Sequence, residues 1–203
     1  MFQFRKIAYH FKEHKFSYSL LLILIVLGFL VGCFYTNFLS ESDFFSAGIQ
    51  AEEFIKQAKE HELSFRLMLS EELSTYLLIA LFSLFLPGFI PTIFLVFKWG
   101  FSSGFFLTFL IKYFAMKGFF LGGLFLITNL MFFLPALMIL ARKSLSVNKY
   151  LLASALQHHS SKTSLPQELL TTSVITLATS FMVAIGVSLK FTLLSPLSNY
   201  LFF

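Results

Sequence analysis

Long apolar runs without charge alternate with short segments that hold almost all of the charged residues. The uncharged runs cover residues 16–40, 73–97, 118–141 and 169–189. A helix needs about 20 apolar residues to cross the ~30 Å hydrocarbon core of a bilayer. Each of the four runs meets this length, so each predicts a membrane-spanning helix.

A further apolar run, between Lys98 and Lys112, is shorter than the others. Its 13 uncharged residues form a helix of only about 20 Å at ~1.5 Å per residue. This run crosses a membrane if the Lys112 side chain extends to the surface and the helix continues to about Met116. The alternative is a re-entrant segment, and length alone does not decide between the two.

The distribution of charge favours a crossing. With five crossings and a cytoplasmic N-terminus, 9 of the 15 basic residues lie in the cytoplasm and 8 of the 10 acidic residues lie in one external segment. With four crossings the basic segment 142–168 would lie outside, against the positive-inside bias. We therefore predict an all-α polytopic membrane protein with five transmembrane helices, N-in and C-out, in a single membrane domain. The expected spans are 17–39, 75–97, 99–116, 118–141 and 169–190, with an external loop at 40–72 and a cytoplasmic loop at 142–168.

The external loop has the pattern of an amphipathic helix. Its apolar residues recur mostly every three to five positions, with charged residues between them, which is typical of a helix with one apolar face. Two interpretations remain open: a helix that docks an extracytoplasmic partner, or a helix that lies on the outer membrane surface or over the bundle. The candidate docking residues are Phe44, Phe45, Glu52, Glu53, Phe54, Ile55, Lys56 and Lys59.

Small and polar residues inside the spans indicate how the helices pack. Two G-x-x-x-G patterns occur, in the first and third spans, and this spacing allows two helices to approach closely. Packing within one bundle is favoured over dimerisation. Asn129 is the most polar residue inside a span, and we expect it to form an interhelical hydrogen bond, with a ligand contact as the alternative. The residues expected in helix packing are Gly28, Gly32, Gly100, Gly104, Asn129 and Pro135.

The second span is interrupted by Pro87, Gly88 and Pro91. Proline removes a backbone donor and bends a helix. A static bend within one continuing helix is favoured, and a hinge or a cavity-lining break is the alternative.

The composition agrees with a membrane location. The chain is 57% hydrophobic and 12% charged, about half the charged fraction of an average soluble domain. The net charge of +5 does not indicate nucleic-acid binding, because the basic residues flank apolar runs instead of clustering on one face.

No motif for catalysis or metal binding is present. The chain lacks Walker A, HExxH and GxSxG patterns, and the adjacent His158 and His159 have no companion ligands. The lysines closest to the spans lie at the expected helix ends: Lys98, Lys112, Lys117 and Lys190. No ion or proton path is therefore predicted, and we expect a protein that is not an enzyme and needs no cofactor.

Several features recur in a fixed order along nearly the whole chain. A basic segment at 10–15 precedes the first span, and an acidic, Phe-rich external loop follows it. After the proline-bearing second span comes Phe97-Lys98-Trp99-Gly100, and in the fourth span Asn129 precedes Leu134-Pro135-Ala136-Leu137. In this order of features the chain resembles the stage II sporulation protein M family of integral membrane proteins. Many members of that family carry an acid just before the Leu-Pro pair, where this chain has Phe133.

The resemblance implies a non-enzymatic membrane scaffold. Such a scaffold recruits the septal peptidoglycan-degrading enzymes, stage II sporulation proteins D and P, while the forespore is engulfed. The implied location is the cell membrane, as a multi-pass protein at the sporulation septum, and the implied partners are membrane lipid and extracytoplasmic or membrane-anchored cell-wall enzymes, without nucleic acid. The alternative is a small permease or a membrane subunit of a transporter, in which the second span and Asn129 line a path.

Overall fold

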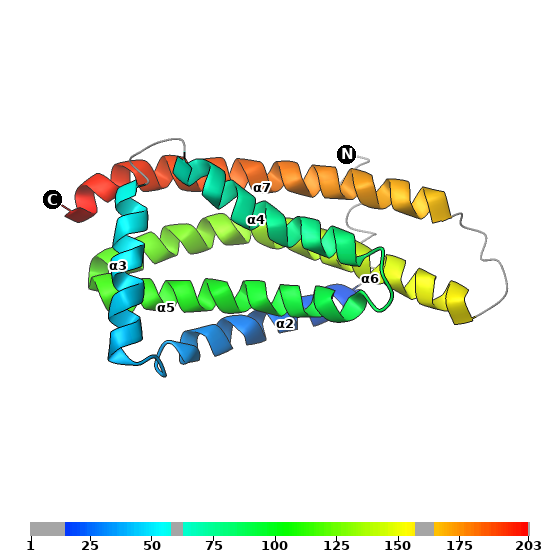
Figure 1. Ribbon diagram of the computed structural model, residues 1–203, viewed down its shortest axis with the longest axis horizontal. Helices are drawn as coiled ribbons and strands as arrows, with labels where there is room; N and C mark the ends of the chain where they lie inside the picture. The colour runs from blue at the N-terminus through cyan, green and yellow to red at the C-terminus, as the bar shows by residue number, and fades with distance from the viewer. Residues whose placement is uncertain (1–14, 58–62, 157–164, 203) are drawn as a thin grey trace.

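The computed structural model describes residues 15–57, 63–156 and 165–202, and every secondary-structure element in these ranges is a helix. The elements are α2 (Lys15–Tyr35), α3 (Glu41–Gln57), α4 (Leu63–Phe82), α5 (Phe89–Thr128), a π-helical turn (Asn129–Phe133), α6 (Leu134–Leu156) and α7 (Leu165–Phe202). Helices α2, α4, α5, α6 and α7 lie along the long axis of a bundle, and α3 stands across one end of it (Figure 1).

Helix α2 packs against the first half of α5 through glycines on both helices. The glycines at this contact are Gly28, Gly32, Gly100 and Gly104. A Cβ at Gly32 would lie 2.1 Å from the carbonyl oxygen of Phe101, closer than any side chain tolerates. Because the contacting residue numbers rise together on the two helices, α2 and this half of α5 run parallel.

The chain reverses direction inside α5, at Ala115. This residue has φ 52° and ψ −125°, outside the helical region. The rings of Phe106 and Phe125 pack with centroids 4.6 Å apart, and a Cβ at Gly118 would meet the backbone of Leu110. At these contacts the residue numbers rise along one segment while they fall along the other. Residues 89–114 and 116–128 therefore run antiparallel and form the two arms of a helical hairpin (Figure 1).

The connection between α4 and α5 is a turn that ends one helix and begins another. The prediction of a bend at Pro87, Gly88 and Pro91 within one continuing helix is wrong, because α4 ends at Phe82 and α5 begins at Phe89. A Cβ at Gly88 would lie 1.7 Å from the carbonyl oxygen of Phe82. The tight return of the backbone at this point therefore requires glycine.

The buried core draws side chains from α2, α4, α5, α6 and α7. Tyr76 and Phe133 are its largest fully buried side chains, and the Tyr76 hydroxyl donates to the Phe133 carbonyl oxygen at 2.9 Å. Phe133 ends the π-helical turn, and Pro135 follows as the second residue of α6. Proline lacks an N–H and disturbs the regular hydrogen bonding of the preceding turn, which accounts for the position of the π-helical turn.

Apolar side chains cover the outside of the bundle as well as its core. Phe94, Phe120 and Leu177 are 64%, 66% and 73% exposed. Within the described part of the chain, three stretches are long and apolar enough to cross a membrane: Lys15–Tyr35, Phe89–Ala155 and Gln167–Leu193. The second of these holds 67 residues and contains the reversal in α5. The prediction of an all-α membrane protein is confirmed at this level.

Candidate functional site

A buried ion pair joins α4 to α7 inside the bundle. The Lys190 ammonium lies 2.8 Å from Glu72 Oε1, and the two side chains are 1% and 22% exposed. The same Nζ lies 4.0 Å from the ring centroids of both Phe125 and Phe133, so two aromatic faces cover the cation. Removing one member of such a pair leaves a charge without a partner in a low-dielectric interior. The pair therefore fixes α4 and α7 relative to each other.

The sequence pattern placed both members of this pair elsewhere. It predicts Glu72 in the external loop and Lys190 at the end of the last span. In the structure α4 begins at Leu63, so Glu72 lies near its middle, and α7 continues past Lys190 to Phe202. Lys190 and Lys98, expected at helix ends, therefore lie within α7 and α5 instead. One signal was present in the sequence, because apolar residues continue after Lys190 to the end of the chain.

A cavity of about 570 Å³ lies between α4 and α5, directly beside the ion pair. Its polar wall is formed by Glu71, Glu72, Thr75, Lys98, Ser102 and Ser103. Aromatic side chains, among them Trp99 and Phe125, line the rest. Phe125 thus contacts the cavity and the Lys190 ammonium at once.

Two charged residues on this wall have no charged partner within the described part of the chain. Glu71 lies on α4 and Lys98 on α5, and both side chains are exposed at the cavity. Lys98 was expected between the second and third spans, but it lies well inside α5 because that helix begins at Phe89. Charged side chains within the spans of membrane proteins usually mark a functional site.

Asn129 lies beside the same cavity. Its Nδ2 donates to Ser103 Oγ at 3.5 Å, so the structure places it in a contact between two segments of the helical hairpin. Its Oδ1 is buried and has no hydrogen-bond partner among the residues that the structure describes. Asn129, Ser103 and Trp99 also line a second, smaller cavity of about 260 Å³, which is apolar and bounded by α2.

Helix α3 closes one end of the bundle (Figure 1). Phe44 packs inward, with its ring centroid 5.1 Å from that of Phe109 and 6.0 Å from that of Tyr113. Phe45 and Ile49 point away and are 65% and 54% exposed. Of the candidate docking residues, Phe44 is therefore an anchor of the helix and Phe45 is accessible. The side chains of the other candidates lie outside the described residues: Glu52, Glu53, Phe54, Ile55, Lys56 and Lys59.

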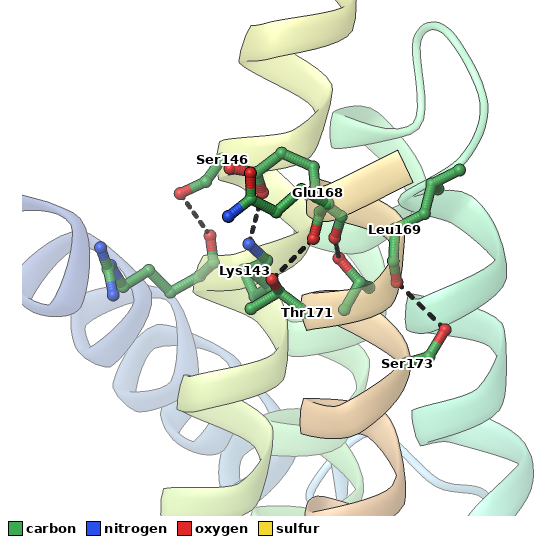
Figure 2. Close-up of polar contacts among 9 residues, drawn as sticks. Lys143, Ser146, Glu168, Leu169, Thr171 and Ser173 are labelled. Atoms are coloured by element: carbon green, nitrogen blue, oxygen red, sulfur yellow. Dashed lines mark hydrogen bonds and ion pairs between the residues drawn. The ribbon is translucent and has the colours of Figure 1, made fainter. Parts of the chain in front are cut away.

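The opposite end of the bundle contains a second ion pair. Figure 2 shows Lys143 of α6 facing Glu168 near the start of α7, with Nζ 2.5 Å from Oε2. Hydroxyls of the same region donate to backbone oxygens of their own helix, as Ser173 does to Leu169 at 3.0 Å. The Lys143 and Glu168 side chains are 16% and 29% exposed, so this ion pair is closer to solvent than the Glu72–Lys190 pair. It holds α6 and α7 together at this end of the bundle.

Among the residues that the structure describes, no group of three or more His, Cys, Asp or Glu side chains is placed to hold a metal ion. His158 and His159 lie outside these residues. Cys33 is half-buried, and its thiol faces the Gly104 carbonyl oxygen at 3.5 Å. Comparison with family models, with curated proteins and with solved structures finds no match to this chain.

Proposed function

We propose that the chain crosses the cell membrane five times, with its N-terminus in the cytoplasm. The crossings are α2, α4, residues 89–114 of α5, the segment that runs from residue 116 through the π-helical turn into α6, and α7. The turn between α4 and α5, the end of α6 and the start of α7 lie at one end of the bundle, and α3 lies across the other end (Figure 1). We assign the first of these ends to the cytoplasm and the α3 end to the outside. Lys15, Arg142, Lys143 and Lys149 then all lie toward the cytoplasm, in agreement with the positive-inside bias.

The orientation predicts opposite labelling of two exposed serines. Cys33 is replaced by alanine, and Ser46→Cys on α3 or Ser154→Cys on α6 is introduced into that background; both serines are exposed. A membrane-impermeant maleimide is expected to label position 46 in intact cells and position 154 only after permeabilisation. The inverse pattern, or equal labelling at both positions, would contradict the proposed orientation.

Within this topology the chain acts as a non-enzymatic scaffold that docks partner proteins on α3. One observation carries this proposal: α3 is fixed across the end of the bundle by Phe44, while Phe45 and Ile49 remain exposed. The acids Glu41 and Asp43 lie exposed on the same helix. Exposed aromatic and aliphatic residues beside polar groups are typical of a docking face. The resemblance to the stage II sporulation protein M family suggests the partners, namely peptidoglycan-degrading enzymes of the sporulation septum.

The docking face is tested by removing its exposed apolar side chains. The double substitution Phe45→Ser/Ile49→Ser is expected to weaken partner recruitment about tenfold, which corresponds to ~1.4 kcal/mol, because two apolar anchors are lost. Photo-cross-linking from position 42 of α3 in living cells, with quantification of cross-linked cell-wall enzyme, measures the effect. Phe45→Leu/Ile49→Leu keeps the apolar character and serves as the matched control.

The same experiment separates the scaffold from a transporter subunit, the second candidate. The observation that favours transport is the polar cavity beside the buried Glu72–Lys190 pair, since charged groups within spans line the paths of many transporters. Retention of all cross-links in the double-serine variant, together with loss of a solute flux in Asn129→Ala, would contradict the scaffold and support transport.

A further inference from the structure

The cavity between α4 and α5 has free charges of both signs on its walls. Glu71 on α4 and Lys98 on α5 are both exposed at the cavity, and neither has a charged partner within residues 15–57, 63–156 and 165–202. The two helices are joined by the turn at one end and separate toward the end that carries α3 (Figure 1). A carboxylate and an ammonium therefore face one space from opposite helices, inside a bundle whose outer surface is apolar.

The positive and negative halves of a ligand have separate partners on these walls. A ligand ammonium finds the Glu71 carboxylate and aromatic side chains such as Trp99 and Phe106 on the cavity wall, whose ring faces can attract a cation. A ligand phosphate finds the Lys98 ammonium and the exposed Ser102 hydroxyl, one turn apart on the same helix. Hydrogen bonds between ionised groups are shorter and stronger than neutral ones.

The smaller apolar cavity shares two wall residues with the first cavity. Trp99 and Ser103 line both cavities, and the smaller one is otherwise bounded by aliphatic and aromatic side chains such as Ile25 and Phe29. Asn129 lies at the same boundary, with a buried Oδ1 that no group of the described chain satisfies. Ser103 thus lies between the polar cavity and the apolar cavity, and the unpaired Asn129 Oδ1 lies beside it.

We propose that this cavity binds a zwitterionic ammonium–phosphate group of the kind found in an aminophospholipid headgroup or in a free phosphoethanolamine-like solute. Glu71 holds the ammonium, and Lys98 and Ser102 hold the phosphate. The site is separate from the docking face on α3, so either can exist without the other.

Trp99 allows a direct test, because it is the only tryptophan of the chain and it lines both cavities. The full-length protein is placed in nanodiscs that contain lipids with brominated chains, which quench tryptophan fluorescence on contact. At equal mole fraction, brominated phosphatidylethanolamine is expected to occupy the site about tenfold more than brominated phosphatidylglycerol, with phosphatidylcholine between them because its ammonium cannot donate a hydrogen bond. In detergent without lipid, phosphoethanolamine is titrated against the same fluorescence.

The variants Glu71→Gln and Lys98→Gln are each expected to abolish the preference. Neither substitution leaves an orphaned partner in the described chain, so both should fold, and Glu71→Asp and Lys98→Arg should retain the preference. Glu41→Gln on α3 is the matched control for loss of one charge outside the cavity. Lipid preference identifies a headgroup, and saturable phosphoethanolamine binding without lipid preference identifies a free solute. Equal quenching by all lipids with no effect of phosphoethanolamine, or a preference that survives both glutamine variants, would overturn the proposal.

Discussion

Replacing Lys190 by methionine is expected to destabilise the folded protein by about 3–5 kcal/mol, the usual loss when one member of a buried ion pair is removed. The Glu72 carboxylate, only 22% exposed, would lose its one cationic partner within the described residues. Phe125 and Phe133 would also lose the cation between them. The reverse substitution, Glu72→Gln, leaves the ammonium at a site where the lysine side chain is 1% exposed, so we expect a loss of similar size.

Unfolding of the purified protein in detergent, followed by size-exclusion profiles after heating, measures these losses. The double variant Lys190→Met/Glu72→Met should recover most of the stability, because no charge is then left unpaired and the volume is nearly kept. Lys143→Met is the matched control and should lose less stability, since its pair with Glu168 is more exposed and an ion pair contributes less as its exposure to solvent rises. Equal losses in Lys190→Met and Lys143→Met would show that burial of the first pair has no special role.

The position of this pair explains where sequence reasoning reached its limit. Apolar length predicts a helix only where charge is absent, so Glu71 and Glu72 marked a loop. Inside α4, Glu72 is paired with Lys190, which is 118 positions away along the chain, and no local pattern reveals that partner. Lys98 was likewise expected in a loop. It lies in the interior of α5, because the chain turns before Phe89 and α5 begins there.

The turn at Gly88 shows a related limit. Prolines and a glycine in an apolar run fit a bent helix and a chain reversal equally well by local chemistry. The chain reverses at this point in the structure. After the turn α5 packs closely on α2, whereas α4 packs on α7. The boundary between the second and third helices was expected at Lys98 and lies at residues 83–88 instead. Successive helices still alternate in direction along the chain.

Spacing was more informative where it described one helix face. The pattern in 40–72 predicts an amphipathic helix, and α3 occupies Glu41–Gln57. The sequence did not show whether Phe44 or Phe45 faces inward. Phe44 does so because its ring packs against Phe109, a residue of a different helix. The glycine spacings likewise indicate close approach, but not that the two patterns pack against each other.

Replacing Gly32 by alanine is expected to separate α2 from α5 and to destabilise the protein by about 1–3 kcal/mol, as overpacking usually does. The added Cβ would lie 2.1 Å from the Phe101 carbonyl oxygen, and a backbone atom cannot rotate away as a side chain does. Gly104→Ala meets the Phe29 carbonyl oxygen at the same distance, so it should have a similar effect. The two substitutions act on one contact, so the double variant should lose less than the sum.

Gly123→Ala provides the matched control for this change. Gly123 lies in α5, and a Cβ there would meet nothing within 4 Å, so alanine should be neutral or stabilising by up to ~1 kcal/mol through its higher helix propensity. Thermal unfolding in the same detergent should therefore rank Gly123→Ala at or above the unmodified protein, and Gly32→Ala and Gly104→Ala well below it. If all three variants unfolded alike, the parallel contact of α2 with α5 would not be the one that sets the stability of the bundle, since only that contact distinguishes them.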